Sequence, residues 1–189
     1  MAVAKTYPAE AVAELLAAGH RHFGENRVQE AEGKYPELKR LYPDLCLHLI
    51  GPLQSNKARQ AVALFDVIET LDRPKLAQVL AAEMQRCGRL LPCLIEVNIG
   101  DEPQKAGIAP AETAEFLVYC SGLGLKIEGL MCIPPHGRDP LPHFRRMAEL
   151  AGALALPTLS MGMSGDYATA IACGAGEIRV GTRLFGGRA

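Results

Sequence analysis

Short apolar runs alternate with amphipathic segments along the whole chain. Eight of these runs have the length of β-strands, and between them hydrophobic residues recur at the spacing of a helix face. Strands that alternate with helices are typical of parallel β/α architecture. The predicted strands are Ala2–Lys5, His22–Glu25, Cys46–Ile50, Asp66–Glu69, Pro92–Asn98, Leu125–Cys132, Thr158–Met161 and Glu177–Val180.

Local capping signals place the helices between these strands. Pro8 and Gly19 delimit the first helix, and Asp72 is expected to cap the helix that carries Leu76. Further helices are expected at Val28–Leu41, after Gln54, at Pro110–Ser121 and from about Leu141 to Leu154.

Eight parallel strands favour a (β/α)8 TIM-type barrel over an open doubly wound sheet, which more often has five or six strands. The length of 189 residues suits one domain, so residues 1–189 are expected to form a single barrel. After the eighth predicted strand only residues 182–189 remain, which is too short for a full eighth helix. We therefore expect the barrel to be partly uncovered between strands eight and one, or to lack an N-terminal covering helix.

Composition narrows the classes of partner. Lys and Arg number 20 against 21 Asp and Glu, and Trp is absent, so nucleic acid and anionic membranes are not expected partners. No apolar run approaches the roughly 20 residues of a membrane span, and the N-terminus lacks the apolar core of a signal peptide. We expect a cytoplasmic protein. The six Cys form no C-x-x-C pair and have no His at ligand spacing, so neither disulfides nor a zinc site are predicted.

Two consecutive strand-to-helix junctions lie in the stretch Leu159–Gly187, with the sequences SMGMSGD and RVGTRLFGG. Each places Gly beside a hydroxyl residue where a helix can begin. Free backbone N–H groups and the helix dipole favour an anion there, and Ser160, Ser164 and Thr182 can add hydroxyl donors. Either half alone also suits an ordinary loop. Together, after the last two strands of a barrel, they predict a phosphate site.

Strand alternation points several polar side chains into the barrel. Ile178 and Val180 share one face of their strand, so Arg179 is expected on the inner face. The same alternation turns His48 and Asn98 inward, and Lys5 ends the first strand. We expect these side chains to converge on the rim that carries the phosphate turns.

An amine nucleophile, a phosphate cradle and a cation in one pocket suit pyridoxal phosphate. A lysine amine can form a Schiff base with the cofactor's aldehyde, and Asp or Arg commonly partners its ring nitrogen. Arg is permanently protonated and can only donate, so it would keep the ring nitrogen unprotonated and weaken the cofactor as an electron sink. An Arg partner therefore suits mild proton chemistry or carriage of the cofactor.

Seven segments make the sequence resemble the pyridoxal phosphate homeostasis protein family, also known as proline synthetase co-transcribed homologues. They are AVAKTYP (2–8), FGENRVQE (23–30), HLIGPLQSNK (48–57), IEVNIGDEPQKAGI (95–108), GLMCIPP (129–135), LSMGMSGDYATAI (159–171) and RVGTRLFG (179–186). The resemblance implies a barrel of the type found in the N-terminal domain of alanine racemase, with bound pyridoxal 5′-phosphate. Family members usually carry an additional N-terminal helix.

The resemblance also implies roles for particular residues. Lys5 corresponds to the Schiff-base lysine and Arg179 to the partner of the ring nitrogen. Ser164, Gly181 and Thr182 correspond to phosphate ligands, and Asn26, His48 and Met131 are expected to line the pocket. The carboxylate of Asp166 would repel a phosphate, so we expect it to point away and to cap its own helix.

Three functions remain open from the sequence. The favoured one is a monomeric, cytoplasmic protein that binds pyridoxal phosphate reversibly and buffers it or delivers it to recipient apo-enzymes, without committed catalysis. The alternative is a pyridoxal phosphate-dependent amino-acid racemase, which needs a second acid/base group that alanine racemase draws from a second domain. A phosphate-binding isomerase would explain the glycine turns and leave Lys5 and Arg179 without roles.

Overall fold

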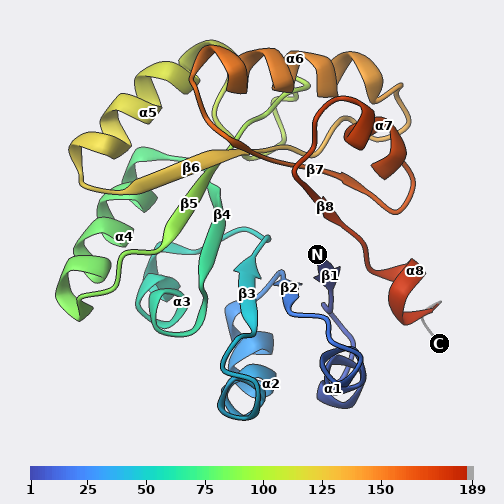
Figure 1. The fold of residues 1–189 in the computed structure, drawn as a ribbon. Helices are drawn as coiled ribbons and strands as arrows, with labels where there is room; N and C mark the ends of the chain where they lie inside the picture. The colour runs from blue at the N-terminus through green and yellow to red at the C-terminus, as the bar shows by residue number, and fades with distance from the viewer. Residues whose placement is uncertain (187–189) are drawn as a thin grey trace.

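The computed structural model describes residues 1–186, in which eight parallel strands form one sheet in the order β1 to β8 (Figure 1). This confirms the predicted (β/α)8 barrel. The strands are β1 (Ala2–Val3), β2 (His22–Glu25), β3 (Cys46–Leu49), β4 (Val67–Leu71), β5 (Pro92–Glu96), β6 (Lys126–Met131), β7 (Thr158–Met163) and β8 (Glu177–Arg179).

The helices lie outside the sheet and alternate with the strands (Figure 1). Across residues 1–186, no helix combines the length and the apolar character that a membrane crossing requires. The α-helices are α1 (Ala9–Ala17), α2 (Val28–Leu41), α3 (Ala58–Leu64), α4 (Pro74–Cys87), α5 (Thr113–Gly122), α6 (Leu141–Ala153), α7 (Tyr167–Ala172) and α8 (Thr182–Phe185), with 3-10 turns η1 (Ser55–Lys57) and η2 (Pro110–Glu112).

Strand alternation separates an apolar outer layer from a polar interior. In β3, Leu47 and Leu49 are fully buried in the hydrophobic core, whereas the intervening His48 bonds to Glu69 of β4. Glu69 in turn contacts Ser160 of β7. Because β4 and β7 are not neighbours in the sheet, these two side chains meet across the inside of the barrel.

Contacts between β1 and β8 bring the two ends of the sheet together. The N–H of Val3 donates to the carbonyl oxygen of Val180 at 2.9 Å. The N–H of Val180 donates to the carbonyl oxygen of Met1 at 3.0 Å. A Cβ at Gly181 would lie 3.2 Å from the carbonyl oxygen of Val3. Glycine at this position therefore allows the close approach of β1.

The outer face of β8 is less buried than that of β5. Ile178 and Val180 are only half-buried, whereas Ile95 of β5 is fully buried. The four-residue helix α8 follows β8 in the described range. The expected gap in cover between strands eight and one stays a prediction.

Several predicted boundaries were wrong by two residues. β1 ends at Val3, so Lys5 lies in the following turn and not at a strand end. β4 extends to Leu71, past the predicted end at Glu69. β7 extends to Met163, since the turn to α7 begins only at Ser164.

The caps also differ in part from the expectation. Asp72 does not cap α4. The N-cap residue is Arg73, which makes no side-chain capping bond, and the carboxylate of Asp72 pairs with the Arg73 guanidinium. The predicted helix at 110–121 opens with the 3-10 turn η2 before α5 begins. Gly187, the last residue of the glycine-rich stretch, and the end of the expected 1–189 domain lie outside the described residues.

Candidate functional site

A cavity of about 300 Å³ opens at the carboxyl ends of β1, β7 and β8. This is the rim on which TIM barrels carry their active sites. Six of the eight site residues expected from the sequence line the cavity, namely Lys5, Asn26, Ser164, Arg179, Gly181 and Thr182. Val3, Tyr7, Ile50, Ile133, Met163 and Gly165 complete the lining.

A larger hollow of about 620 Å³ lies outside the barrel, between α4 and the start of β6. Its one charged lining residue, Arg89, donates to the carbonyl oxygens of Val62, Ala63 and Phe65 at the end of α3. Because this guanidinium is committed to the backbone, the hollow offers little chemistry. The smaller cavity at the strand ends is therefore the candidate functional site.

The turn that carries Lys5 is held in place by Lys34 of α2. The Lys34 ammonium donates to the carbonyl oxygens of Ala4 at 2.9 Å and Tyr7 at 3.0 Å. Within the turn, Thr6 has a φ of 68°, a left-handed conformation that is uncommon outside glycine. These two bonds of Lys34, called the Lys34 clamp below, thus fix the backbone on both sides of Lys5.

Lys34 is also one half of a buried ion pair. Its Nζ lies 2.6 Å from Oε1 of Glu25, whose side chain is completely buried. Burial raises the pKa of Glu25, and the hydrogen bond and positive charge of Lys34 oppose that rise. Because a buried carboxylate needs a cation beside it, Glu25 holds the ammonium where it can bind the Lys5 turn.

The two glycine-containing junctions lie side by side at the cavity. The hydroxyl of Thr182 donates to the Ser164 hydroxyl oxygen over 3.3 Å, which joins the turn after β7 to the start of α8. Within residues 1–186, no protein acceptor is found for the backbone N–H groups of Ser164 and Gly165. Two hydroxyls and two backbone donors are therefore gathered where the sequence predicted a phosphate site.

Two expectations for this stretch were wrong. Asp166 is the N-cap residue of α7 but makes no capping bond to it, because its Oδ1 accepts the N–H of Met163 at 2.6 Å. Ser160 offers no donor to the cavity, since it is fully buried and donates its hydroxyl hydrogen to Glu69. Of the three hydroxyl residues expected at the predicted phosphate site, Ser164 and Thr182 therefore line the cavity and Ser160 does not.

Arg179 faces the barrel interior, as strand alternation predicted. Its Nη1 donates to Oγ of Ser160 at 2.6 Å, and its Nη2 donates to the carbonyl oxygen of Cys132 at 2.8 Å. The side chain is 4% exposed and reaches the cavity wall. These bonds fix the guanidinium plane, which leaves its other N–H groups to a ligand in the cavity.

A chain of buried polar groups continues from Arg179 through the barrel. Ser160 donates to Oε2 of Glu69 at 2.6 Å, and Nδ1 of His48 lies 2.8 Å from Oε1 of the same carboxylate. Burial opposes the charge on Glu69, but the hydrogen bond from His48 and the charge of Arg179 lower its pKa. Burial likewise opposes the charge on His48, yet bonds with Cys46 and Glu69 raise its pKa to about 10. Inside the barrel, the Glu69 carboxylate thus lies between two groups of opposite charge, the His48 imidazole and the Arg179 guanidinium.

Three residues expected at the cavity lie elsewhere in the described structure. His48 contacts Glu69 in the interior, below the lining residues. Met131 is fully buried in β6, paired in register with Ser160. Asn98 binds the backbone of Glu102 through both its amide oxygen and nitrogen, so it shapes the loop after β5. Contact of His48 or Met131 with a bound ligand stays a prediction.

Sequence reasoning missed Glu69, the residue on which His48, Ser160 and Arg179 converge. A signal existed, because Glu69 is the one charged residue of β4, whose other members are Val67, Ile68, Thr70 and Leu71. A carboxylate at such a position has to find buried partners. Their identity depended on pairing across the barrel, which sequence spacing does not give.

Comparisons with known proteins bear on this site. The family model of the alanine racemase N-terminal domain matches residues 1–189. A pyridoxal phosphate homeostasis protein from Vibrio alginolyticus is 41% identical over 199 residues, which cover all of this chain and 85% of that protein. PipY of Synechococcus elongatus PCC7942 in its structure without pyridoxal phosphate is 45% identical with a TM-score of 0.93, covering 98% of this chain and 91% of that one. The structure of PipY with pyridoxal phosphate bound has 44% sequence identity to this chain and a TM-score of 0.88, and it covers the same 98% of this chain and 91% of the PipY chain.

We predict that Lys34→Met lowers the free energy of unfolding by about 3–5 kcal/mol, because it leaves the buried Glu25 carboxylate without its cation. The double variant with Glu25→Leu should recover most of this loss. Urea denaturation measures both. Lys126→Met is the matched control, since its pair with Glu128 is more than half exposed on the Lys side and should contribute less than about 1 kcal/mol. Equal effects of Lys34→Met and Lys126→Met would contradict the role of the clamp.

Proposed function

Because the chain belongs to the pyridoxal phosphate homeostasis protein family and matches the alanine racemase N-terminal domain along its length, we propose that it binds pyridoxal 5′-phosphate reversibly and without committed catalysis. Its role would be intracellular cofactor homeostasis. The observation that carries the proposal is the cavity itself, which joins an amine, a buried guanidinium and a pair of hydroxyl-bearing turns. The volume of about 300 Å³ suits a small cofactor.

Lys5 is the residue we propose for the covalent link. It is the one lysine among the described residues that line the cavity. Condensation of its neutral amine with the cofactor's aldehyde forms a C=N bond and releases one water molecule. Lys34 is close along the fold but is held by Glu25 and two carbonyl oxygens, so it does not compete for the aldehyde.

Ser164, Gly181 and Thr182 are proposed to hold the phosphate. The hydroxyls of Ser164 and Thr182 are within hydrogen-bond distance of each other, so both can turn toward one anion. Gly181 brings the start of α8 against β1, which sets the cradle beside the Lys5 turn. Asn26 lines the same cavity and completes the polar wall.

Arg179 is proposed to donate to the ring nitrogen. Ser160 and the Cys132 carbonyl fix its position, and a guanidinium offers only hydrogen-bond donors. A donor that never releases its proton keeps the ring nitrogen unprotonated. The bound cofactor is then a weak electron sink, which favours carriage over committed chemistry on an amino acid.

The same features support delivery of the cofactor to recipient apo-enzymes. An imine to Lys5 is reversible by hydrolysis, and the cavity opens at the rim of the barrel, where water can enter. Tyr7 is the tyrosine that lines the cavity among the described residues, and its hydroxyl donates to the carbonyl of Gly186.

We predict that Lys5→Ala removes the visible absorbance that the wild-type protein gains on addition of pyridoxal phosphate. Loss of the amine leaves no lysine among the described residues that line the cavity, so the imine is not formed there. Lys75→Ala is the matched control, because Lys75 is exposed on α4, and it should keep the full signal. A wild-type protein that stays colourless with added cofactor would overturn the proposed function.

A second prediction concerns the phosphate. The double variant Ser164→Ala and Thr182→Val removes two hydroxyl donors. Each hydrogen bond to a charged acceptor contributes about 1.5–3 kcal/mol of binding free energy. Affinity for pyridoxal phosphate should fall at least about tenfold per hydroxyl. Affinity for pyridoxal, which lacks the phosphate, should change little. Isothermal titration of both ligands measures the difference, and an equal loss for the two would argue against the cradle.

A third prediction separates carriage from catalysis. The loaded protein, incubated with single L-amino acids, should form D-enantiomer no faster than free pyridoxal phosphate does. Chiral chromatography follows the products, with Lys5→Ala as the parallel sample. Turnover well above the free cofactor's rate would show the racemase alternative to be correct.

A further inference from the structure

A second cluster of reactive side chains begins at the end of the barrel opposite the cofactor cavity. His22 and Cys46 are the first residues of β2 and β3, and His48 follows two positions after Cys46. Lys5, Ser164 and Thr182 all follow the carboxyl ends of their strands. Since the strands are parallel, His22 and Cys46 lie toward the opposite end from the cavity, and His48 lies in the interior between the two.

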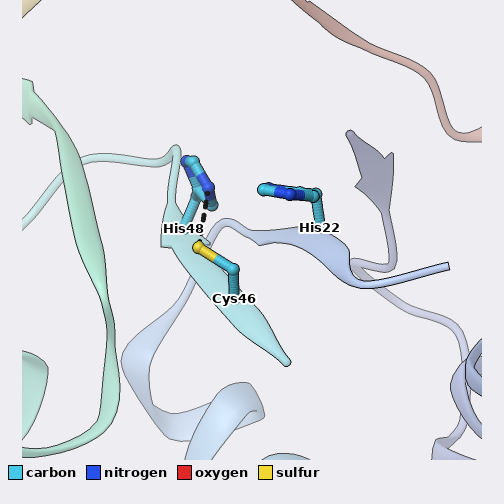
Figure 2. Close-up of side chains that lie close together, drawn as sticks. All are labelled: His22, Cys46 and His48. Carbon is cyan, nitrogen blue, oxygen red and sulfur yellow. Dashed lines mark hydrogen bonds between the residues drawn. The ribbon is translucent and has the colours of Figure 1, made fainter. Parts of the chain in front are cut away.

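Strand register brings the three side chains together. His22 of β2 is the direct partner of Cys46 on β3. Cys46 and His48 are two residues apart on one strand, so they project from the same face. Figure 2 shows His22 pointing from its strand toward His48, with Cys46 bonded to His48. Sequence spacing alone did not predict this group, because its third member comes from another strand.

The geometry is that of three ligands around one point. Cys46 Sγ lies 3.3 Å from Nε2 of His48, and one donor atom from each of the three residues lies within 4.8 Å of the others. A tetrahedral zinc ion with bonds of about 2.0–2.3 Å places its ligand atoms roughly 3.5 Å apart. The exposed His22 side chain has freedom to close that difference.

Glu69 orients the buried imidazole for such a role. Its Oε1 lies 2.8 Å from Nδ1 of His48, and Oε1 of Glu177 lies 3.7 Å from the same nitrogen. Both carboxylates face Nδ1, so Nε2 is the nitrogen directed at Cys46. A carboxylate behind a ligating histidine is the usual arrangement in protein metal sites, where it fixes the tautomer and raises the basicity of the ring.

We propose that His22, Cys46 and His48 bind one borderline divalent transition metal ion, with Zn²⁺ as the best match. One thiolate and two imidazoles are ligands that zinc accepts, and exposure of His22 leaves room for a water molecule in the fourth position. The metal replaces the thiol proton of Cys46 and the proton on Nε2 of His48. Two protons leave to solvent, and Nδ1 keeps its proton toward Glu69.

The test is a Zn²⁺ titration of the full, tag-free chain, reduced and loaded with cofactor. Equilibrium dialysis with metal counting should give one zinc per chain. X-ray absorption at the zinc edge should show one sulfur and two imidazole nitrogens. His22→Ala and Cys46→Ser should each weaken binding at least tenfold. Because His22 is exposed, its loss should leave the fold intact, which far-UV circular dichroism checks.

The matched controls are His136→Ala and Cys87→Ser, which remove an exposed histidine and an exposed cysteine from other parts of the described structure. Both should bind zinc as the wild type does. A zinc shell without sulfur, no stoichiometric binding, or unchanged affinity in His22→Ala and Cys46→Ser would overturn the proposal. The cofactor absorbance of the same samples reports on the Lys5 site independently, so failure of one site is distinguishable from failure of the other.

Discussion

The buried carboxylate of Glu69 is the group around which the interior of this barrel is arranged. Most TIM barrels fill this space with branched apolar side chains. Here a fully buried anion accepts a hydrogen bond from Ser160 and faces the imidazole of His48, and Arg179 lies 3.9 Å away. Each of these three side chains stabilises the negative charge of Glu69, and its own position is fixed by that contact. The position of Arg179 at the cavity is thus a consequence of how a charge is accommodated inside the barrel.

The fold and much of the candidate site could be predicted from the sequence because both depend on local periodicity. Alternation along β8 placed Arg179 inside, and the glycine-rich junctions identified Ser164 and Thr182. The resemblance to a known family supplied the ligand. What the sequence could not give depended on pairs that meet only in three dimensions. Lys34, thirty residues from Ala4, clamps the Lys5 turn, and Ser160 bonds to Glu69 across the barrel. The cap of α4 was also predicted wrongly, because Asp72 pairs with the Arg73 guanidinium and Arg73 is the N-cap residue.

The two ends of the barrel carry different reactive groups, and both sets adjoin the same polar interior. At the carboxyl ends, an amine and hydroxyl donors surround a cavity suited to an anionic aldehyde. At the amino ends, His22 and Cys46 present nitrogen and sulfur donors. His48 and Arg179 both contact Glu69, so the same buried carboxylate lies between the His22–Cys46–His48 group and the cavity. The proposed role of the cavity, which is to hold its ligand without transforming it, rests on a guanidinium that can only donate hydrogen bonds and on the position of the cavity at the rim of the barrel.

The measurement that tests the central claim most directly is the mapping of the covalent link. The protein is loaded with pyridoxal phosphate, reduced with borohydride, digested and examined by mass spectrometry. We expect the reduced cofactor on Lys5, at one equivalent per chain, while the clamped Lys34 and the exposed Lys75 remain unmodified. A label spread over several lysines, or found on Lys34, would contradict the assignment of the cavity as the cofactor site.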